Sequence, residues 1–217
     1  LNLLEEMFDY KLDFYNVDLS KSDDIKLFSE KICEKYNIID IIINCAALVG
    51  TSEFKGWCAT FENQSLDAFD KCMDVNTKAP ILLFKLFLNN LKLSNNPKVI
   101  NISSIYGIIG NDFKLYEDTE MKAPLAYNVS KAGLNIMSKY LASYYGDINL
   151  CINNVILGGV YRNQDEKFVQ KYIDKVPLKR MAVEDDIKGI ILYLSSNLSK
   201  YVTGQDFVID GGLTCCI

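Results

Sequence analysis

The sequence predicts an α/β fold with a parallel, doubly wound sheet, and three observations support this. Strand and helix patterns alternate along the chain, as they do where helices connect parallel strands. Residues 38–44 are mostly aliphatic, which is typical of a strand covered by helices on both faces. The chain has 217 residues, of which 49% are hydrophobic, and this suffices for a substantial core. We therefore expect residues 1–217 to form one domain.

Three elements are predicted before residue 50. Residues 13–17 are predicted to form a short strand. Ser22 then caps a helix, because it stands just before an apolar-periodic segment and two acids follow it in the first turn. The aliphatic run 38–44 is the next strand.

The remaining elements continue this alternation. Ser65 is predicted to cap the next helix, and Pro80 to interrupt it before it resumes over residues 81–91. The later elements are a strand over 98–102, a helix over 125–144, a strand over 149–156, helical segments over 165–175 and 184–194, and a strand over 206–209.

The charge and hydropathy of the chain argue against nucleic-acid and membrane partners. The net charge is −5, and Lys and Arg are scattered without a basic stripe, so nucleic-acid binding through phosphates is not expected. The longest apolar run, residues 80–88, is short and contains Lys85, so no membrane span is expected. Small molecules are the expected partners.

The reactive residue types exclude several classes of enzyme. Seven cysteines at irregular spacing, without a cleavable leader before them, predict a reducing cytoplasm and no metal site. The chain contains no histidine, which excludes Ser-His-Asp and Cys-His hydrolases and most zinc chemistry. Acid–base chemistry must therefore use tyrosine, lysine or carboxylates.

One set of residues suits such chemistry. Tyr127 and Lys131 are four apart on a predicted helix, so a fixed ammonium can lie beside a phenol and favour its ionised form. A free tyrosine titrates near ~10, and lowering that pKa makes it a usable proton donor at neutral pH. Ser104 ends a predicted strand, where open α/β sheets bind ligands, so its hydroxyl could hold a carbonyl oxygen against that phenol.

Several segments in the same order resemble the short-chain dehydrogenase/reductase family, NAD(P)-dependent oxidoreductases on a Rossmann fold. The likeness runs from about residue 13 to residue 212. The matching positions are Asn44-Cys45-Ala46-Ala47 after a strand, Asn76 in a helix, the set Ser104, Tyr127 and Lys131, the segment 153–159, and the closing segment 201–212.

The resemblance implies catalytic roles for four residues. Tyr127 would be the general acid in reduction and the general base in oxidation. Lys131 would lower the pKa of Tyr127 and hold the nicotinamide ribose. Ser104 would orient and polarise the carbonyl, and Asn76 would secure a water that relays protons. The implied cofactor is NAD or NADP, which itself supplies the hydride.

The resemblance also implies contacts with that nucleotide. Asp18, followed by Leu19, would contact the adenine. The segment Asn44, Cys45 and Ala46 would lie along the nucleotide, and Gly158 and Gly159 would flank the nicotinamide.

Each of these positions has a structural alternative. Residues 18–20 could be a strand exit and capping turn, Asn76 could bond locally in a bent helix, and the two glycines could form only a tight turn. Ser103 and Ser104 could both be structural.

Three departures from the family pattern have consequences. The first βαβ portion with its glycine-rich, pyrophosphate-binding turn is absent, so we expect a longer protein and an interrupted sheet. Leu157 stands where the family usually has proline. Ser104 and Tyr127 are separated by an insertion that includes residues 111–121, which we expect beside the catalytic groups.

The insertion and residues 103–107 and 139–146 look like a subgroup described as flagellin-modification or surface-polysaccharide oxidoreductases. This subgroup implies a sugar or sugar-phosphate substrate in bacterial glycan synthesis. The family also implies a homodimer or homotetramer built on the helix after Tyr127. Two alternatives remain open: a noncatalytic binding or assembly protein on the same scaffold, and a sugar-nucleotide epimerase or dehydratase.

Overall fold

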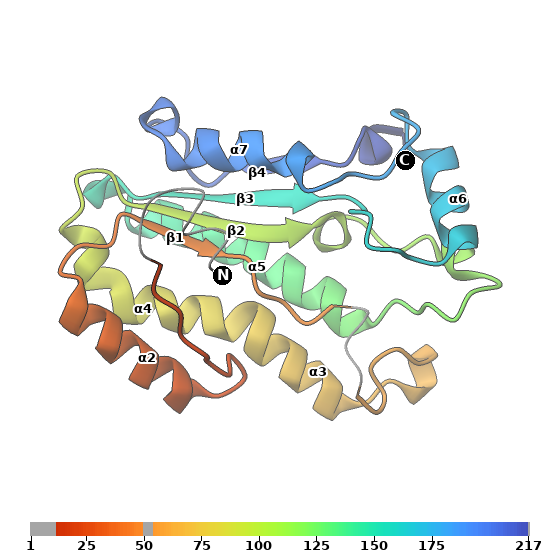
Figure 1. Cartoon of the computed structure of the whole chain (residues 1–217), viewed down its shortest axis with the longest axis horizontal. Helices are drawn as coiled ribbons and strands as arrows, with labels where there is room; N and C mark the ends of the chain where they lie inside the picture. The colour runs from red at the N-terminus through yellow and green to blue at the C-terminus, as the bar shows by residue number, and fades with distance from the viewer. Residues whose placement is uncertain (1–11, 50–53, 217) are drawn as a thin grey trace.

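The computed structural model describes residues 12–49 and 54–216, and these build one sheet of four parallel strands (Figure 1). The strands are β1 (Ile41–Asn44), β2 (Lys98–Ser104), β3 (Cys151–Leu157) and β4 (Asp206–Ile209), and they lie in that order across the sheet. Each strand pairs with the next along the chain in parallel register. The predicted α/β class with a parallel sheet is confirmed.

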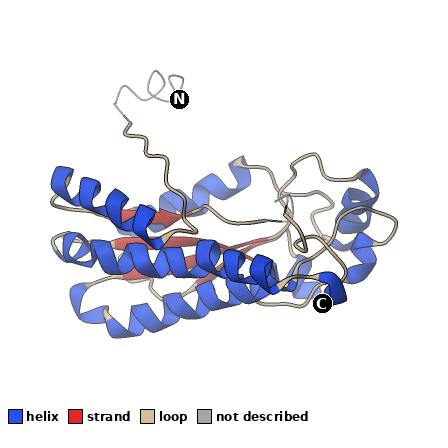
Figure 2. Cartoon of the chain, turned by 90° about the horizontal axis from the view of Figure 1, so that it is seen from below, coloured by secondary structure: helices blue, strands red, loops and turns tan. Residues whose placement is uncertain are grey.

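Helices cover both faces of the sheet, as the doubly wound prediction requires. Val99 and Ile152 pack toward α4 (Ala79–Lys92) and α5 (Leu125–Tyr144). Their neighbours Ile100 and Val155 pack on the opposite face against Leu194 of α7 (Asp185–Ser195). Alternate residues of β2 and β3 therefore face opposite layers, and Figure 2 shows the helical layer from below.

Two further helices lie outside this sandwich. Helix α2 (Ser22–Lys35) packs on α4, and α6 (Glu166–Lys175) lies beyond the carboxyl ends of the strands (Figure 1). The predicted helix over 165–175 is therefore confirmed, with Asp165 as its N-cap. The expected cap by Ser22 is wrong, because Lys21 is the N-cap of α2 and makes no side-chain cap bond.

The predicted strand over 13–17 does not form, and the strand predicted over 38–44 shortens to β1. A strand needs a hydrogen-bonded neighbour, and in residues 12–49 and 54–216 no strand pairs with the second edge of β1. Residues 12–18 lie instead against α2, where the Tyr15 ring meets Phe28 at 5.3 Å.

The helix that Pro80 was predicted to interrupt is divided just before it. Ser65 caps α3 (Leu66–Met73) by accepting a hydrogen bond from Ala68 N at 3.1 Å, as predicted. A π-helical segment, Asp74–Lys78, then leads into α4, whose first turn contains Pro80. This wider turn buries Asn76 and Thr77, and such turns are frequent at functional sites.

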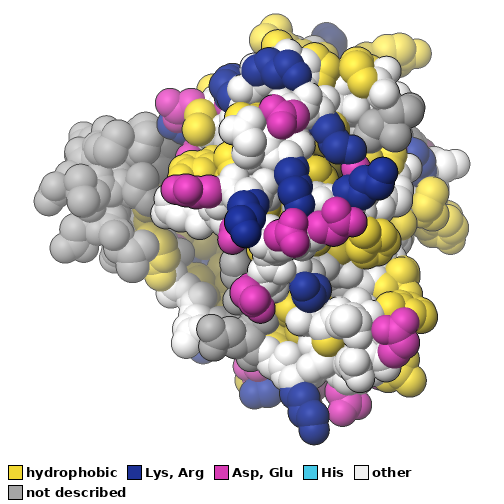
Figure 3. Space-filling model, turned by 90° about the vertical axis from the view of Figure 1, so that its right-hand side faces the viewer, with side chains coloured by type: hydrophobic (Ala, Val, Ile, Leu, Met, Phe, Trp, Pro, Cys, Tyr) yellow, Lys and Arg dark blue, Asp and Glu magenta, His cyan; other side chains and the backbone are white. Residues whose placement is uncertain are grey.

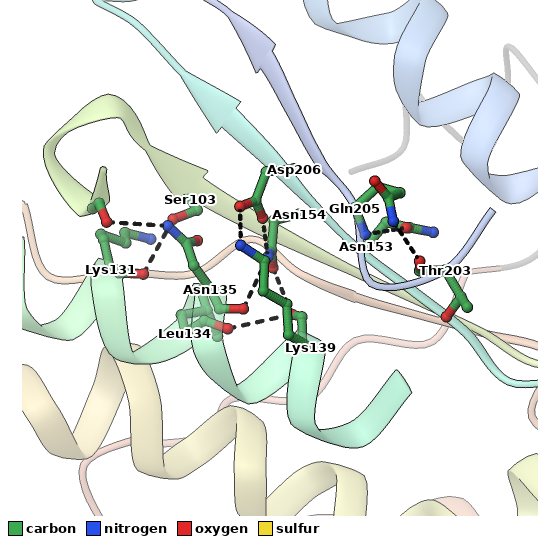
Figure 4. A network of polar contacts seen from close by, with 12 residues as sticks. Ser103, Lys131, Leu134, Asn135, Lys139, Asn153, Asn154, Thr203, Gln205 and Asp206 are labelled. Atoms are coloured by element: carbon green, nitrogen blue, oxygen red, sulfur yellow. Dashed lines mark hydrogen bonds and ion pairs between the residues drawn. The ribbon is translucent and has the colours of Figure 1, made fainter. Parts of the chain in front are cut away.

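A chain of polar side chains, called here the polar row, crosses the middle of the sheet on the face toward α5. Figure 4 shows its end, at Asn154, Asp206 and Lys139. Each strand contributes one member, and the four are in register. Two consecutive residues of α5 complete the row. Its members are Asn44, Asn101, Asn154, Asp206, Ser138 and Lys139.

No helix in the described ranges is long and apolar enough to cross a membrane.

Candidate active site

A cavity of about 200 Å³ opens at the carboxyl ends of β2 and β3. Ser104, the last residue of β2, and Tyr127, in the first turn of α5, both line it. Gly158 and Gly159, directly after β3, form another part of its wall. The predicted carbonyl-orienting hydroxyl and the predicted proton donor therefore share one cavity.

Tyr127 is partly buried between this cavity and a cluster around Trp57 and Cys72. Burial raises the pKa of the phenol, and a hydrogen bond with Ser104 opposes the rise. The phenol of Tyr127 is therefore protonated at neutral pH.

Lys131 is not among the groups that shift the pKa of Tyr127 in the protein by itself, so the expectation that it lowers this pKa stays a prediction. The Lys131 Nζ lies 5.7 Å from the centroid of the Tyr127 ring and donates a hydrogen bond to the Ile102 carbonyl at 2.8 Å. Desolvation lowers the pKa of this ammonium to about 8. Lys131 is only 3% exposed, so burial disfavours its charged form. Burial is also the largest influence on the pKa of the Tyr127 phenol.

The two adjacent serines point to different partners. Ser103 faces α5, where its Oγ donates to the Lys131 carbonyl at 3.5 Å. Ser104 caps the following turn by accepting from Tyr106 N at 3.2 Å and borders the cavity. Side chains alternate between the two faces along β2, so Ser104 faces the cavity and Ser103 faces α5.

Asn76 bonds both locally and to distant segments, and the local bond runs from its Nδ2 to Cys72 Sγ, four residues earlier, at 3.3 Å. Its Oδ1 accepts from Leu48 N at 2.7 Å, and its Nδ2 donates to Leu48 O at 3.1 Å and to Ser130 Oγ at 3.0 Å. The buried amide therefore joins the segment after β1 to α5, one residue before Lys131. The water relay expected of Asn76 stays a prediction.

Gly158 and Gly159 are required by close packing, and neither has a positive φ. A Cβ on Gly158 would lie 2.8 Å from the Asp210 Cα, and one on Gly159 would lie 2.8 Å from the ring of Tyr172. The Tyr172 hydroxyl accepts a hydrogen bond from Gly159 N at 2.5 Å. These glycines thus serve more than a tight turn, because their lack of a side chain lets Asp210 and Tyr172 pack against the backbone.

The segment after β1 approaches the same catalytic group from another side. Asn44 Nδ2 donates to Asn101 Oδ1 at 2.7 Å and so belongs to the polar row. Cys45 and Ala46 are exposed, and Cys45 is near enough to influence the ammonium of Lys131 electrostatically.

Asp18 and Leu19 lie apart from this cavity. Asp18 Oδ1 accepts hydrogen bonds from the backbone and the hydroxyl of Ser20, at 3.0 and 2.6 Å. Asp18 Oδ2 also forms an ion pair with Lys21 Nζ at 3.3 Å. Leu19 lines a separate depression near Asp74. The protein contacts of Asp18 match the capping-turn alternative, and its adenine contact stays a prediction.

The sequence reasoning missed several residues of the cavity wall. Tyr106, Asn128 and Gln164 line it, as does Tyr172 from α6. Asn128 could have been suspected from its place beside Tyr127. Tyr172 had no such signal, because only the packing of α6 across the strand ends places it there.

No group of three or more cysteines and carboxylates that could hold a metal ion occurs within residues 12–49 and 54–216.

Comparison with known proteins gives consistent relatives. A family model described as enoyl-(acyl carrier protein) reductase matches residues 2–214. The post-translational flagellin modification protein A of Campylobacter coli is 31% identical over 210 residues, covering 96% of this chain and 80% of that protein. A 3-oxoacyl-(acyl-carrier-protein) reductase of Thermotoga maritima is 29% identical over 207 residues, covering 94% and 77%.

A solved structure agrees with these sequence relatives. The short-chain dehydrogenase of Leptospira borgpetersenii with bound NAD+ superposes with a TM-score of 0.85 at 31% identity, over 95% of this chain and 78% of that one. The matches extend through the strands, the cavity and the closing segment. The chain therefore belongs to the short-chain dehydrogenase/reductase family of oxidoreductases.

Proposed function

We propose that this protein is an NAD(P)-dependent oxidoreductase that interconverts a carbonyl and a secondary alcohol, with Tyr127 as general acid and base. One observation carries the proposal: Ser104 and Tyr127 border the same cavity, and the Ser104 hydroxyl is near enough to lower the pKa of the Tyr127 phenol. A substrate oxygen that reached both hydroxyls would be polarised by Ser104 and protonated by Tyr127.

The residues around the cavity suit the nicotinamide ribose of a bound dinucleotide. The Lys131 ammonium is buried and donates to the Ile102 carbonyl. An ammonium has three donors, so ribose hydroxyls would be suitable further acceptors. Gly158 and Gly159 form part of the cavity wall, where a flat ring could pack against the backbone. When bound, the dinucleotide supplies or accepts the hydride.

Asn76 acts in this proposal as a positioning residue. Its hydrogen bonds to Leu48 and Ser130 hold the segment after β1 against α5. Lys131 follows Ser130 directly, so the amide fixes the turn of α5 that carries the ammonium. Protons would pass from solvent to Lys131 and then to Tyr127 through water and ribose hydroxyls, with Asn76 securing the water.

The proposed substrate is a sugar or sugar phosphate in bacterial glycan synthesis. The flagellin modification relative supports this assignment. The cavity also has both kinds of surface that a sugar needs, with the amides of Asn111 and Asn128 for its hydroxyls and the rings of Tyr106 and Tyr116 for its apolar face.

The protein is proposed to act as a cytoplasmic homodimer or homotetramer. Ile136, Tyr140 and Tyr144 of α5 are 64%, 64% and 65% exposed, and they offer an apolar surface for a second copy. All seven cysteines are free, as suits a reducing compartment.

Titration with NADH and NADPH, followed by a screen of carbonyl substrates, tests the proposal. We expect fluorescence-detected binding of at least one nucleotide. We also expect turnover that falls by about 10²–10⁴-fold in Tyr127→Phe, while nucleotide affinity stays within about twofold. If Tyr127→Phe retained near-normal turnover, Tyr127 would not be the proton donor. Folded protein that bound neither nucleotide would favour the noncatalytic alternative.

A further inference from the structure

The insertion between β2 and α5, residues 108–124, forms an ordered wall of the cavity because α6 holds its outer side. Lys171 Nζ donates to the Glu117 carbonyl at 2.6 Å, and Lys175 forms an ion pair with Asp112. Both lysines lie on one helix, so they fix two separate points of the insertion. The wall can therefore present side chains to the cavity at defined positions.

Helix α5 holds the inner side of the same wall. Asn128 Nδ2 donates to Asn111 Oδ1 at 2.7 Å and so fixes the orientation of the Asn111 amide. Burial raises the pKa of the Tyr116 phenol, and hydrogen bonding to Tyr106 and the Asn111 amide opposes that rise. The Asn111 Nδ2 is nevertheless a buried donor without an acceptor at normal hydrogen-bond geometry among the described residues. An oxygen of a bound molecule would satisfy it.

The wall also brings one cation to the cavity. Among the described residues that line it, Lys122 alone carries a charge. Its Nζ donates to the Thr119 carbonyl at 3.4 Å, which is a long bond, and it takes part in none of the ion pairs of the described residues. Thr119 is itself buried and holds the turn before Lys122 by donating from Oγ1 to Tyr116 O at 2.9 Å.

The lysines on the outer surface near α6 differ from Lys122. Figure 3 shows basic and acidic side chains intermingled on this end of the molecule. Lys175 there is paired with Asp112, and Lys171 is bound to backbone carbonyls. The ammonium groups of Lys171 and Lys175 therefore already have acceptors within the protein. The Lys122 ammonium has one long hydrogen bond within the protein, so its charge and its other donors can bind a molecule in the cavity.

We propose that Lys122 binds an anionic group of the substrate, a carboxylate or a phosphate, while the reacting carbon lies at Ser104 and Tyr127. This inference rests on the proposed function of the same cavity. Hydrogen bonds between an ammonium and an anionic oxygen are about twice as strong as those between neutral groups. The Asn111 Nδ2, which has no acceptor at normal hydrogen-bond geometry among the described residues, supplies a second contact on the same wall. The substrate class is therefore an anionic carbonyl compound or its alcohol.

Three probes that share one ring test the inference: D-glucose, D-glucuronate and D-glucose 6-phosphate. Their affinities are measured by calorimetry for the wild type, Lys122→Met and Lys114→Met, each saturated with the nucleotide that it binds. Lys114 is a matched control, because it is an exposed lysine of the same insertion that does not line the cavity. Melting temperatures of the two variants establish that both are folded.

We expect the wild type to bind at least one of the anions about tenfold more tightly than glucose. Lys122→Met should lose that preference, and Lys114→Met should keep it. The probe that carries the preference identifies the group as carboxylate or phosphate. Equal affinity for all three probes, no binding of either anion, or a preference that persists in Lys122→Met would each overturn the inference.

Turnover separates this inference from the proposed function. If Tyr127-dependent hydride transfer occurs but Lys122→Met changes neutral and anionic probes alike, the oxidoreductase function stands and the anion site fails. If hydride transfer is absent and Lys122-dependent anion binding remains, the proposed function fails and the binding site stands. If hydride transfer and anion binding both occur, Lys122→Met should raise KM for the anion and leave kcat within about twofold. A contact away from the reacting carbon stabilises the bound substrate and the transition state equally.

Discussion

The polar row and the cavity are built from the same residue types, but their polar atoms have different surroundings. In the row, Asn154 accepts from Ser138 at 2.5 Å and donates to Asp206 at 2.7 Å. In the cavity wall, the Asn111 Nδ2 is buried without an acceptor at normal hydrogen-bond geometry among the described residues. Buried groups that are satisfied within the protein specify the fold, whereas unsatisfied ones near a cavity are candidates for binding.

The lysines of these two regions show the same contrast. Lys139, at the end of the row, reaches Asp206 at 2.6 Å and leaves its side chain 48% exposed. Lys131, beside the cavity, is almost fully buried with a backbone carbonyl as its acceptor, and desolvation lowers its pKa to about 8. Of these two lysines, the one beside the cavity has an ammonium disfavoured by burial, as is frequent at functional sites.

Asn154→Leu should break the row and cause the largest loss of stability. Leucine has a similar size but leaves Ser138 and Asp206 without their partner, which costs about 2–4 kcal/mol. Urea unfolding measures the change. Asn197→Ala is the control, because Asn197 is an exposed asparagine that accepts from Asn96 Nδ2 at 2.7 Å, and it should cost less than about 0.5 kcal/mol. Equal effects of the two substitutions would show that the row does not hold the sheet.

Lys131→Met should remove a dependence of stability on pH. The pKa of Lys131 is lowered from 10.5 to about 8 in the folded protein. Between these values the unfolded chain binds more protons, so Lys131 makes stability rise with pH, by about 1.4 kcal/mol per pH unit. The gain of Lys131→Met over the wild type should be largest below pH 8 and shrink as the pH approaches 10.5.

Urea unfolding at several pH values measures this difference. Asn197→Ala provides the comparison, since Asn197 is an exposed residue without an ionisable group, and its difference from the wild type should change little over the same range. A constant difference for Lys131→Met would mean that Lys131 is charged without penalty in the folded protein.

Ser104→Ala sharpens the comparison by separating activity from stability. Loss of one polarising donor should lower kcat by about 10²-fold, while the free energy of unfolding changes by less than about 1 kcal/mol. Ser103→Ala is the matched control, because Ser103 faces the Lys131 carbonyl instead of the cavity. Steady-state kinetics of both variants test this, and a larger loss of activity in Ser103→Ala would reverse the assignment.

Lys139→Met should have the smallest effect. The ion pair with Asp206 joins side chains that are 48% and 20% exposed, and such pairs contribute about 0–1 kcal/mol. The loss should shrink further in high salt, because exposed charges are screened. A loss of stability as large as that of Asn154→Leu would show that the ion pair, and not the asparagine amides, stabilises the row.

Much of the fold could be predicted because its signals are local. The helix over 125–144 and the strand over 206–209 have the predicted bounds. Ser65 caps its helix as its sequence context indicates. The strand over 13–17 was wrong because strand formation depends on a neighbour, which periodicity does not report.

The candidate site was predicted less completely. The family motif identifies Ser104, Tyr127 and Lys131, since their spacing survives in the sequence. It did not indicate that burial raises the pKa of Tyr127, because desolvation depends on what packs around the phenol. Nor did it identify Tyr172, whose hydroxyl reaches Gly159 from a helix thirteen residues away.

The sequence by itself determined the α/β class, the order of most elements and the residue types available for chemistry, because periodicity, caps and motifs are properties of short segments. Only the tertiary structure decided which of those residues share a cavity. It placed Ser104 with Tyr127, left Asp18 in a turn of its own, and brought Lys122 to the wall. Burial and partners arise from packing between distant segments, and these decide whether a polar group holds the fold or remains free to bind.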